Sequence, residues 1–92
     1  MAKLTVRLYA SLEEAAHAKR IETEGETLRD ALRDLGAKGG QALRDALFDE
    51  AGSVRPAVQL LLRSTYVDPA RLDTVTIHDG DTLHVMPPMA GG

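Results

Sequence analysis

The chain has 92 residues, a net charge of −3, no cysteine, and only three aromatic side chains, Tyr9, Phe48 and Tyr66. This length fits one small domain, whose core must consist mainly of Leu, Val, Ile and Ala. The lack of a basic surplus argues against nucleic-acid binding, the absence of cysteine excludes disulfides and thiolate metal sites in this chain, and no apolar run approaches a membrane span.

The first expected elements are a strand, a short helix and a second strand. Residues 3–9 alternate between apolar Leu4, Val6 and Leu8 on one face and Lys3, Thr5, Arg7 and Tyr9 on the other. This alternation differs from a signal peptide and, with the absence of cysteine, leads us to expect a cytoplasmic protein. A helix is expected over residues 11–18, where Ser11 and Glu14 have the spacing of a capping box. The charged residues 19–24 indicate an edge strand.

The middle of the chain predicts two helical segments. In the first, Thr27 can cap a helix whose first turn contains Asp30, and Gly36 is a natural stop. Its apolar stripe consists of Leu28, Ala31, Leu32 and Leu35. Residues 37–40 are expected to form a loop, and residues 41–52 form a second amphipathic stretch.

The last third predicts two further strands. Residues 56–64 form a buried strand with Val58, Leu60 and Leu62 on one face and Gln59, Leu61 and Arg63 on the other. A connection with a turn at Asp68-Pro69 follows. Residues 74–87 give a short apolar segment, a turn at Asp79-Gly80 and a final strand, in which His84 and Met86 face away from Leu83 and Val85. The order of elements indicates an α+β domain, a mixed sheet with helices on one face.

The C-terminal tail, residues 87–92, is expected to extend from a domain formed by residues 1–86. Pro87 and Pro88 cannot continue a sheet ladder. Extended, the tail would reach about 20 Å, and Ala90, Gly91 and Gly92 are small enough to enter a narrow channel. The α-carboxylate of Gly92 is the functional group at this end. It becomes an acyl donor only when an oxygen is converted to a leaving group, for instance by adenylation. A carrier handled by other enzymes and an inert end both remain open.

The final stretch "DGDTLHVMPPMAGG" resembles the ending of the ubiquitin-like sulfur carriers, and most resembles the small subunit of molybdopterin synthase, the MoaD type of the MoaD/ThiS superfamily. The matching features are Asp79-Gly80-Asp81, a strand, Pro87 and Pro88, then Met89, Ala90, Gly91 and Gly92. The order of the other elements is similar to that of the ubiquitin-like β-grasp fold, with four to five strands. The chain departs from the family at Arg63-Ser64, where an Asn-Gly or Asn-Asp turn is common.

The resemblance implies a protein without catalytic groups or a stably bound cofactor. An ATP-dependent activating enzyme would adenylate Gly92, and a persulfide on a sulfur-donor protein would displace AMP to leave a thiocarboxylate. The tail would then enter the large subunit of molybdopterin synthase and donate sulfur to a pterin precursor. One alternative is a sulfur carrier for another pathway, namely cysteine synthesis, thiamine synthesis or the thiolation of tRNA. The others are a modifier joined to lysines of target proteins and a binding module whose tail is incidental.

The uncovered face of the sheet is a candidate partner-binding surface, because ubiquitin-like proteins commonly dock partners there. It would present Leu61 and Met86 surrounded by Arg7, Arg63 and His84. An ordinary solvated sheet surface is the alternative. No metal site is expected, because the three histidines lack ligand spacing.

Overall fold

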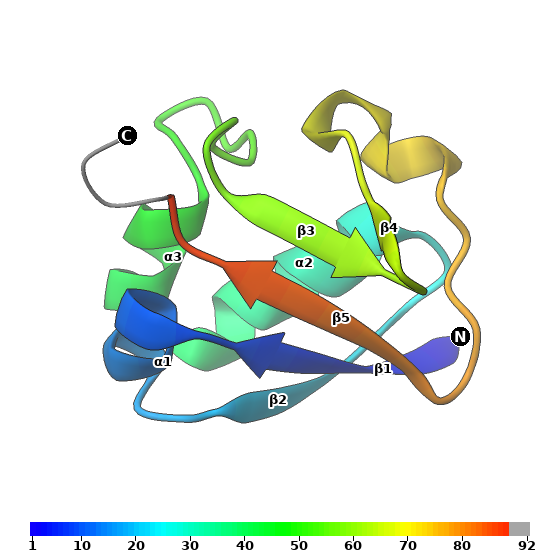
Figure 1. Ribbon diagram of the computed structural model, residues 1–92, viewed down its shortest axis with the longest axis horizontal. Coiled ribbons are helices and arrows are strands. Elements are labelled where there is room, and N and C mark those ends of the chain that lie inside the picture. Colours follow the sequence, from blue (N-terminus) through cyan, green and yellow to red (C-terminus); the bar gives the residue numbers. More distant parts are fainter. Residues whose placement is uncertain (89–92) are drawn as a thin grey trace.

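The computed structural model describes residues 1–88, which form a five-stranded mixed sheet and three α-helices (Figure 1). The strands lie in the order β2-β1-β5-β3-β4; β1 and β5 are parallel, and the other neighbours are antiparallel. The elements along the chain are β1 (Ala2–Leu8), α1 (Ala10–Ala16), β2 (Arg20–Gly25), α2 (Leu28–Gly39), α3 (Gln41–Leu47), β3 (Gln59–Leu62), β4 (Thr65–Tyr66), a 3-10 helix (Pro69–Thr74) and β5 (Asp81–Met86). The α+β prediction and the β-grasp arrangement are confirmed.

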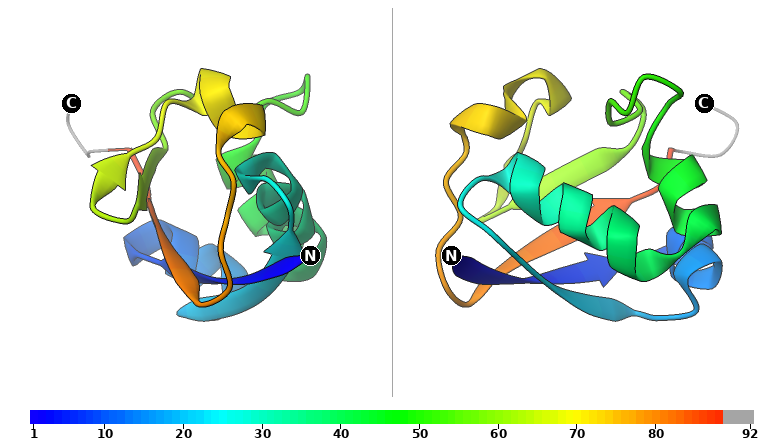
Figure 2. Two further views of the ribbon diagram at one scale, coloured as in Figure 1. Left: turned by 90° about the vertical axis from the view of Figure 1, so that its right-hand side faces the viewer. Right: turned by 180° about the vertical axis from the view of Figure 1, so that it is seen from behind.

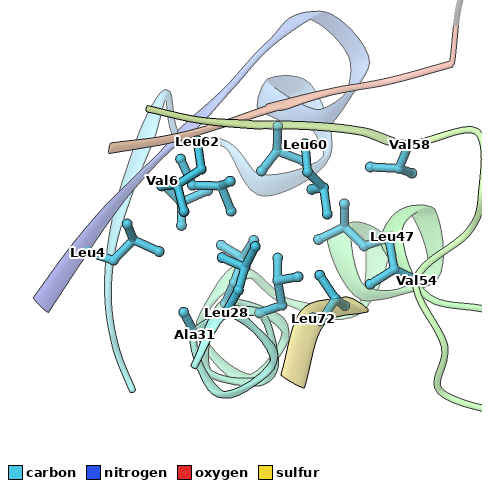
Figure 3. Close-up of a cluster of buried hydrophobic side chains, with 14 of the residues drawn as sticks. Leu4, Val6, Leu28, Ala31, Leu47, Val54, Val58, Leu60, Leu62 and Leu72 are labelled. Atoms are coloured by element: carbon cyan, nitrogen blue, oxygen red, sulfur yellow. The ribbon is translucent and has the colours of Figure 1, made fainter. Parts of the chain in front are cut away.

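The core lies between the sheet and the helices on one of its sides. Figure 3 shows Leu4, Val6, Leu60 and Leu62 of the strands facing side chains that include Leu28, Ala31, Leu47 and Leu72. The predicted alternation is therefore correct for β1, β3 and β5. Figure 2 shows α2 and α3 on one side of the sheet, so the outward-facing residues of the central strands form an uncovered surface. Within residues 1–88, no helix has the length and apolarity that crossing a membrane requires.

Helix α2 begins as predicted but continues past its predicted end. The Thr27 hydroxyl accepts from the Asp30 backbone N–H, and the Asp30 carboxylate accepts from the Thr27 N–H, which makes a capping box. Backbone hydrogen bonds from Thr27 and Glu26 lower the pKa of Asp30. The sequence predicts that the helix ends at Gly36, but Gly36 lies inside the helix, where a Cβ would come within 3.1 Å of Cε2 of Phe48. Gly36 therefore makes room for the Phe48 ring, and residues 37–39 are helical.

Two other local predictions are corrected. The Ser11–Glu14 capping box does not form, because α1 begins at Ala10 and Ser11 already lies in its first turn. The connection after β3 contains β4 and the 3-10 helix, both of which were missed. Asp68 initiates that 3-10 helix, with its carboxylate accepting from the Ala70 N–H at 2.9 Å. The helical prediction for residues 41–52 is confirmed for α3, residues 41–47.

Candidate functional site

The tail begins where the central strand of the sheet ends. β5 lies between β1 and β3, and its last pair with β3 joins Met86 to Gln59. Pro87 and Pro88 follow directly, and neither has a backbone N–H that could extend the ladder. The sheet therefore fixes the base of the tail on both sides. The predicted tail residues Met89, Ala90, Gly91 and Gly92 lie outside the described residues.

Four outward-facing side chains form one row across the sheet beside this point. The strand registers pair Arg7 with His84, His84 with Leu61, and Leu61 with Tyr66. Met86 occupies the same face in the next row, opposite Gln59. We call the surface of Arg7, His84, Leu61, Met86 and Tyr66 the open face. Four of these residues are half-buried, and Tyr66 is 65% exposed.

The open face has an apolar part and a basic part. Leu61, Met86 and the Tyr66 ring supply apolar area, whereas Arg7 and His84 supply polar groups on the β1 side. Aromatic residues, Met and Arg are the side chains that protein interfaces favour. The open face therefore has the composition of a protein-binding surface, and it lies beside Met86, where β5 ends.

Tyr9 organises the basic part of the open face. Its hydroxyl lies 2.7 Å from Nδ1 of His84, and Cζ of Arg7 lies 4.5 Å from the centroid of its ring. The Arg7 guanidinium also contacts the carboxylate of Glu13 at 3.5 Å. These contacts hold the His84 ring and the Arg7 side chain in place by hydrogen bonding and a cation–π interaction. Tyr9 was not among the predicted site residues, although its position in the alternation of β1 already placed it on the same side as Arg7.

Arg63, predicted for this surface, does not join the other residues. The strand alternation stops at Leu62, because Arg63 and Ser64 form the turn between β3 and β4 with φ angles of 49° and 65°. The Arg63 guanidinium forms an ion pair with Asp81 and donates to the carbonyl of Thr76 at 3.2 Å. Asp81 begins β5, so Arg63 lies at the end of that strand opposite Met86.

The Asp79-Gly80-Asp81 motif ties three segments together at that same end. The Asp79 carboxylate accepts from the backbone N–H of Lys3 at 2.8 Å, and the Asp81 carboxylate accepts from the N–H of His78, also at 2.8 Å. Gly80 has a φ of 86°, which glycine adopts without strain. The motif thus forms the predicted turn and joins it to the start of β1 and to Arg63. Its role in the described structure is to fix where β5 begins.

The open face lacks the groupings that a metal site would need. Among residues 1–88, no three or more His, Asp or Glu side chains come together in a way that could hold a metal ion. The Tyr9–His84 pair is a hydrogen-bonded contact on a surface shared with apolar groups.

Comparison with known proteins gives one family and several similar structures. The model of the ThiS family matches residues 6–92. No curated protein matches the chain. The Haloferax volcanii HVO 2177 protein has 31% identity and a TM-score of 0.71, over 99% of this chain and 87% of that one.

Two further solved structures are similar to this chain. The small archaeal modifier protein 1 of Methanosarcina acetivorans has 26% identity and a TM-score of 0.83, over 100% of this chain and 98% of that one. A candidate subunit 1 of a molybdopterin converting factor from Pyrococcus furiosus has 23% identity and a TM-score of 0.71, over 97% of this chain and 100% of that one. At 23% identity, the second likeness bears on the fold alone.

Proposed function

The chain belongs to the ThiS family of ubiquitin-like sulfur carriers and modifiers, and from that premise we propose that Gly92 is adenylated and converted to a thiocarboxylate. The observation that carries the proposal is that the family match extends through Gly91 and Gly92. The position of the tail supports it, because β5 brings the chain to Pro87 beside the open face. A partner bound to the open face would lie beside Met86, directly before the start of the tail at Pro87.

The proposed reaction uses enzymes other than this protein for every chemical step. The Gly92 carboxylate attacks the α-phosphate of ATP on an activating enzyme, which forms an acyl adenylate and releases pyrophosphate. A protein persulfide attacks the acyl carbon and releases AMP, leaving an acyl disulfide. A thiol then cleaves the S–S bond, which releases the thiocarboxylate and leaves a disulfide on the sulfur donor. Glycine favours the acyl transfers because no side chain shields its carbonyl carbon.

We propose molybdopterin synthesis as the pathway. The tail would enter the large subunit of molybdopterin synthase and donate its sulfur there to a pterin precursor. The ending supports this choice, because Asp79-Gly80-Asp81, the paired prolines and Met89-Ala90-Gly91-Gly92 resemble the MoaD type of carrier. The open face is the proposed docking surface for both the activating enzyme and the large subunit. The two partners would then bind in turn, since each would need the same surface and the same tail.

The experiment that tests the adenylation step is ATP–pyrophosphate exchange with the activating enzyme. The unmodified chain should support exchange, and a chain with one residue added after Gly92 should not, because the reacting carboxylate is displaced from the site. A matched control carries the same extra residue before Met1 and should retain exchange. Equal exchange by both extended chains would contradict the proposal, provided that circular dichroism shows both to be folded.

A second candidate function is conjugation of Gly92 to lysine side chains. The similarity to the small archaeal modifier protein 1, with 26% identity and a TM-score of 0.83, favours this candidate. The same acyl adenylate would then lead to an isopeptide bond instead of a thiocarboxylate. Immunoblots of cells that express the chain distinguish the two. A ladder of covalent products that disappears in a variant lacking Gly91 and Gly92 supports the modifier.

A further inference from the structure

Within residues 1–88, the sheet ends at β2 on one side and at β4 on the other, and the edge of β2 is the longer. β2 has six residues, whereas β4, at the other edge, has two. The N–H of Leu8 donates to the carbonyl of Lys19 at 2.8 Å. In an antiparallel ladder every second residue bonds to the neighbouring strand, so Lys19, Ile21 and Thr23 direct their backbone groups toward β1. The backbone groups of Arg20, Glu22 and Glu24 therefore point away from the sheet. Such a row of backbone groups is a template for another strand.

Two side chains of α2 bond to this edge. Nζ of Lys38 donates to the carbonyl of Glu22 at 2.9 Å, and the Asp34 carboxylate accepts from the N–H of Glu24 at 3.0 Å. Asp34 and Lys38 also form an ion pair with each other at 2.8 Å, one helical turn apart. The Glu22 carbonyl and the Glu24 N–H, in the middle of the edge, are thus already bonded. The Asp34 and Lys38 side chains occupy the position that an added strand would take.

We propose that the edge of β2 is a latent pairing surface for a second copy of this chain, which the Asp34–Lys38 pair keeps closed. The choice of a second copy follows from the charges on β2. Antiparallel pairing of two β2 strands about a two-fold axis at Ile21 places Arg20 of each copy opposite Glu22 of the other. Thr5 donates to the Glu22 carboxylate at 2.8 Å, which holds that carboxylate over the sheet.

The alternative register is less favourable. With the two-fold axis at Glu22, Arg20 would face Glu24, but the two Glu22 side chains would face each other, and like charges directly opposite are destabilising. In this proposal the closed edge keeps the protein a monomer, and the open face, the docking surface of the proposed function, remains available. Opening the edge would join two sheets into one continuous sheet through β2.

The test is the mass in solution of the variant Asp34→Ala/Lys38→Ala. Analytical ultracentrifugation should show a concentration-dependent dimer, at least about tenfold tighter than any self-association of the unmodified protein, which corresponds to about 1.4 kcal/mol. Lys38→Met should shift the equilibrium in the same direction, since it removes only the amine. The matched control is Arg29→Ala, which removes an ion pair of the same helix with Asp73 and should stay monomeric.

Two further variants identify the surface. Adding Arg20→Glu to the double variant should abolish the dimer, because it places like charges opposite each other. Adding Arg20→Glu together with Glu22→Arg should restore it, because the opposite charges return in reversed order. The proposal is overturned if the folded double variant and Lys38→Met both stay monomeric over the concentrations tested. The proposal is also overturned if the double variant still dimerises after Arg20→Glu is added without Glu22→Arg. A native protein that already dimerises through β2 would overturn it as well.

Discussion

The substitution Asp81→Ala tests whether the Asp-Gly-Asp motif stabilises the fold. The Asp81 side chain is 12% exposed, and its carboxylate accepts from the N–H of His78 and pairs with Arg63. Hydrogen bonds to a charged group contribute about 1.5–3 kcal/mol each. The Arg63 side chain is 45% exposed, so solvent screening reduces its share. We therefore expect a loss of about 3 kcal/mol, and a fall in Tm of about 10–20 °C.

Asp73→Ala is the matched control, measured beside Asp81→Ala by urea and thermal denaturation. Asp73 also pairs with an arginine, Arg29, but its side chain is 69% exposed. Exposed ion pairs contribute about 0–1 kcal/mol, so the control should lose little stability. If Asp81→Ala cost no more than Asp73→Ala, the Asp81 carboxylate would not be what fixes the turn and the start of β5.

Three other outcomes are expected. Ser64→Gly should raise the free energy of unfolding by about 1 kcal/mol in urea titrations, because Ser64 has a φ of 65°; a loss of stability would contradict this. Asp30→Asn should be destabilising at neutral pH, and the difference from the native protein should shrink as the pH falls below 3.8 through the lowered pKa of Asp30; a pH-independent difference would contradict the capping contribution. Leu61→Asp should raise the KM of the activating enzyme for this chain, with little change in kcat. The control Ala42→Asp, on the exposed side of α3, should leave both constants unchanged. Equal effects of the two variants would contradict the open face as the docking surface.

The elements with a clear period were predictable from the sequence. The strict alternation around Leu4, Leu60 and Leu83 marks the buried face of each strand. A shift of register by one residue would bury the outward-facing residues of these strands instead. The start of α2 was predictable because Thr27 and Asp30 supply both halves of the capping interaction locally. These signals depend on neighbours in the chain, so they need no knowledge of tertiary contacts.

The errors arose where distant contacts override a local signal. Gly36 is a stop signal by itself, but in the fold it is the helical residue against which Phe48 packs. The turn at Arg63-Ser64 uses left-handed backbone without the usual Asn-Gly sequence, so β4 and the direction of Arg63 could not be read from it. Its stabilisation comes from Asp81, eighteen residues later. Tyr9, by contrast, could have been included from the alternation alone.

The central claim is that Gly92 receives sulfur from a partner. The most direct measurement is the intact mass of the chain after expression with the activating enzyme and a persulfide donor, followed by fragmentation to locate any change. Replacement of one oxygen by sulfur, confined to Gly92, is the predicted result. An unchanged mass, under conditions where the enzyme demonstrably turns over ATP with this chain, would contradict the claim.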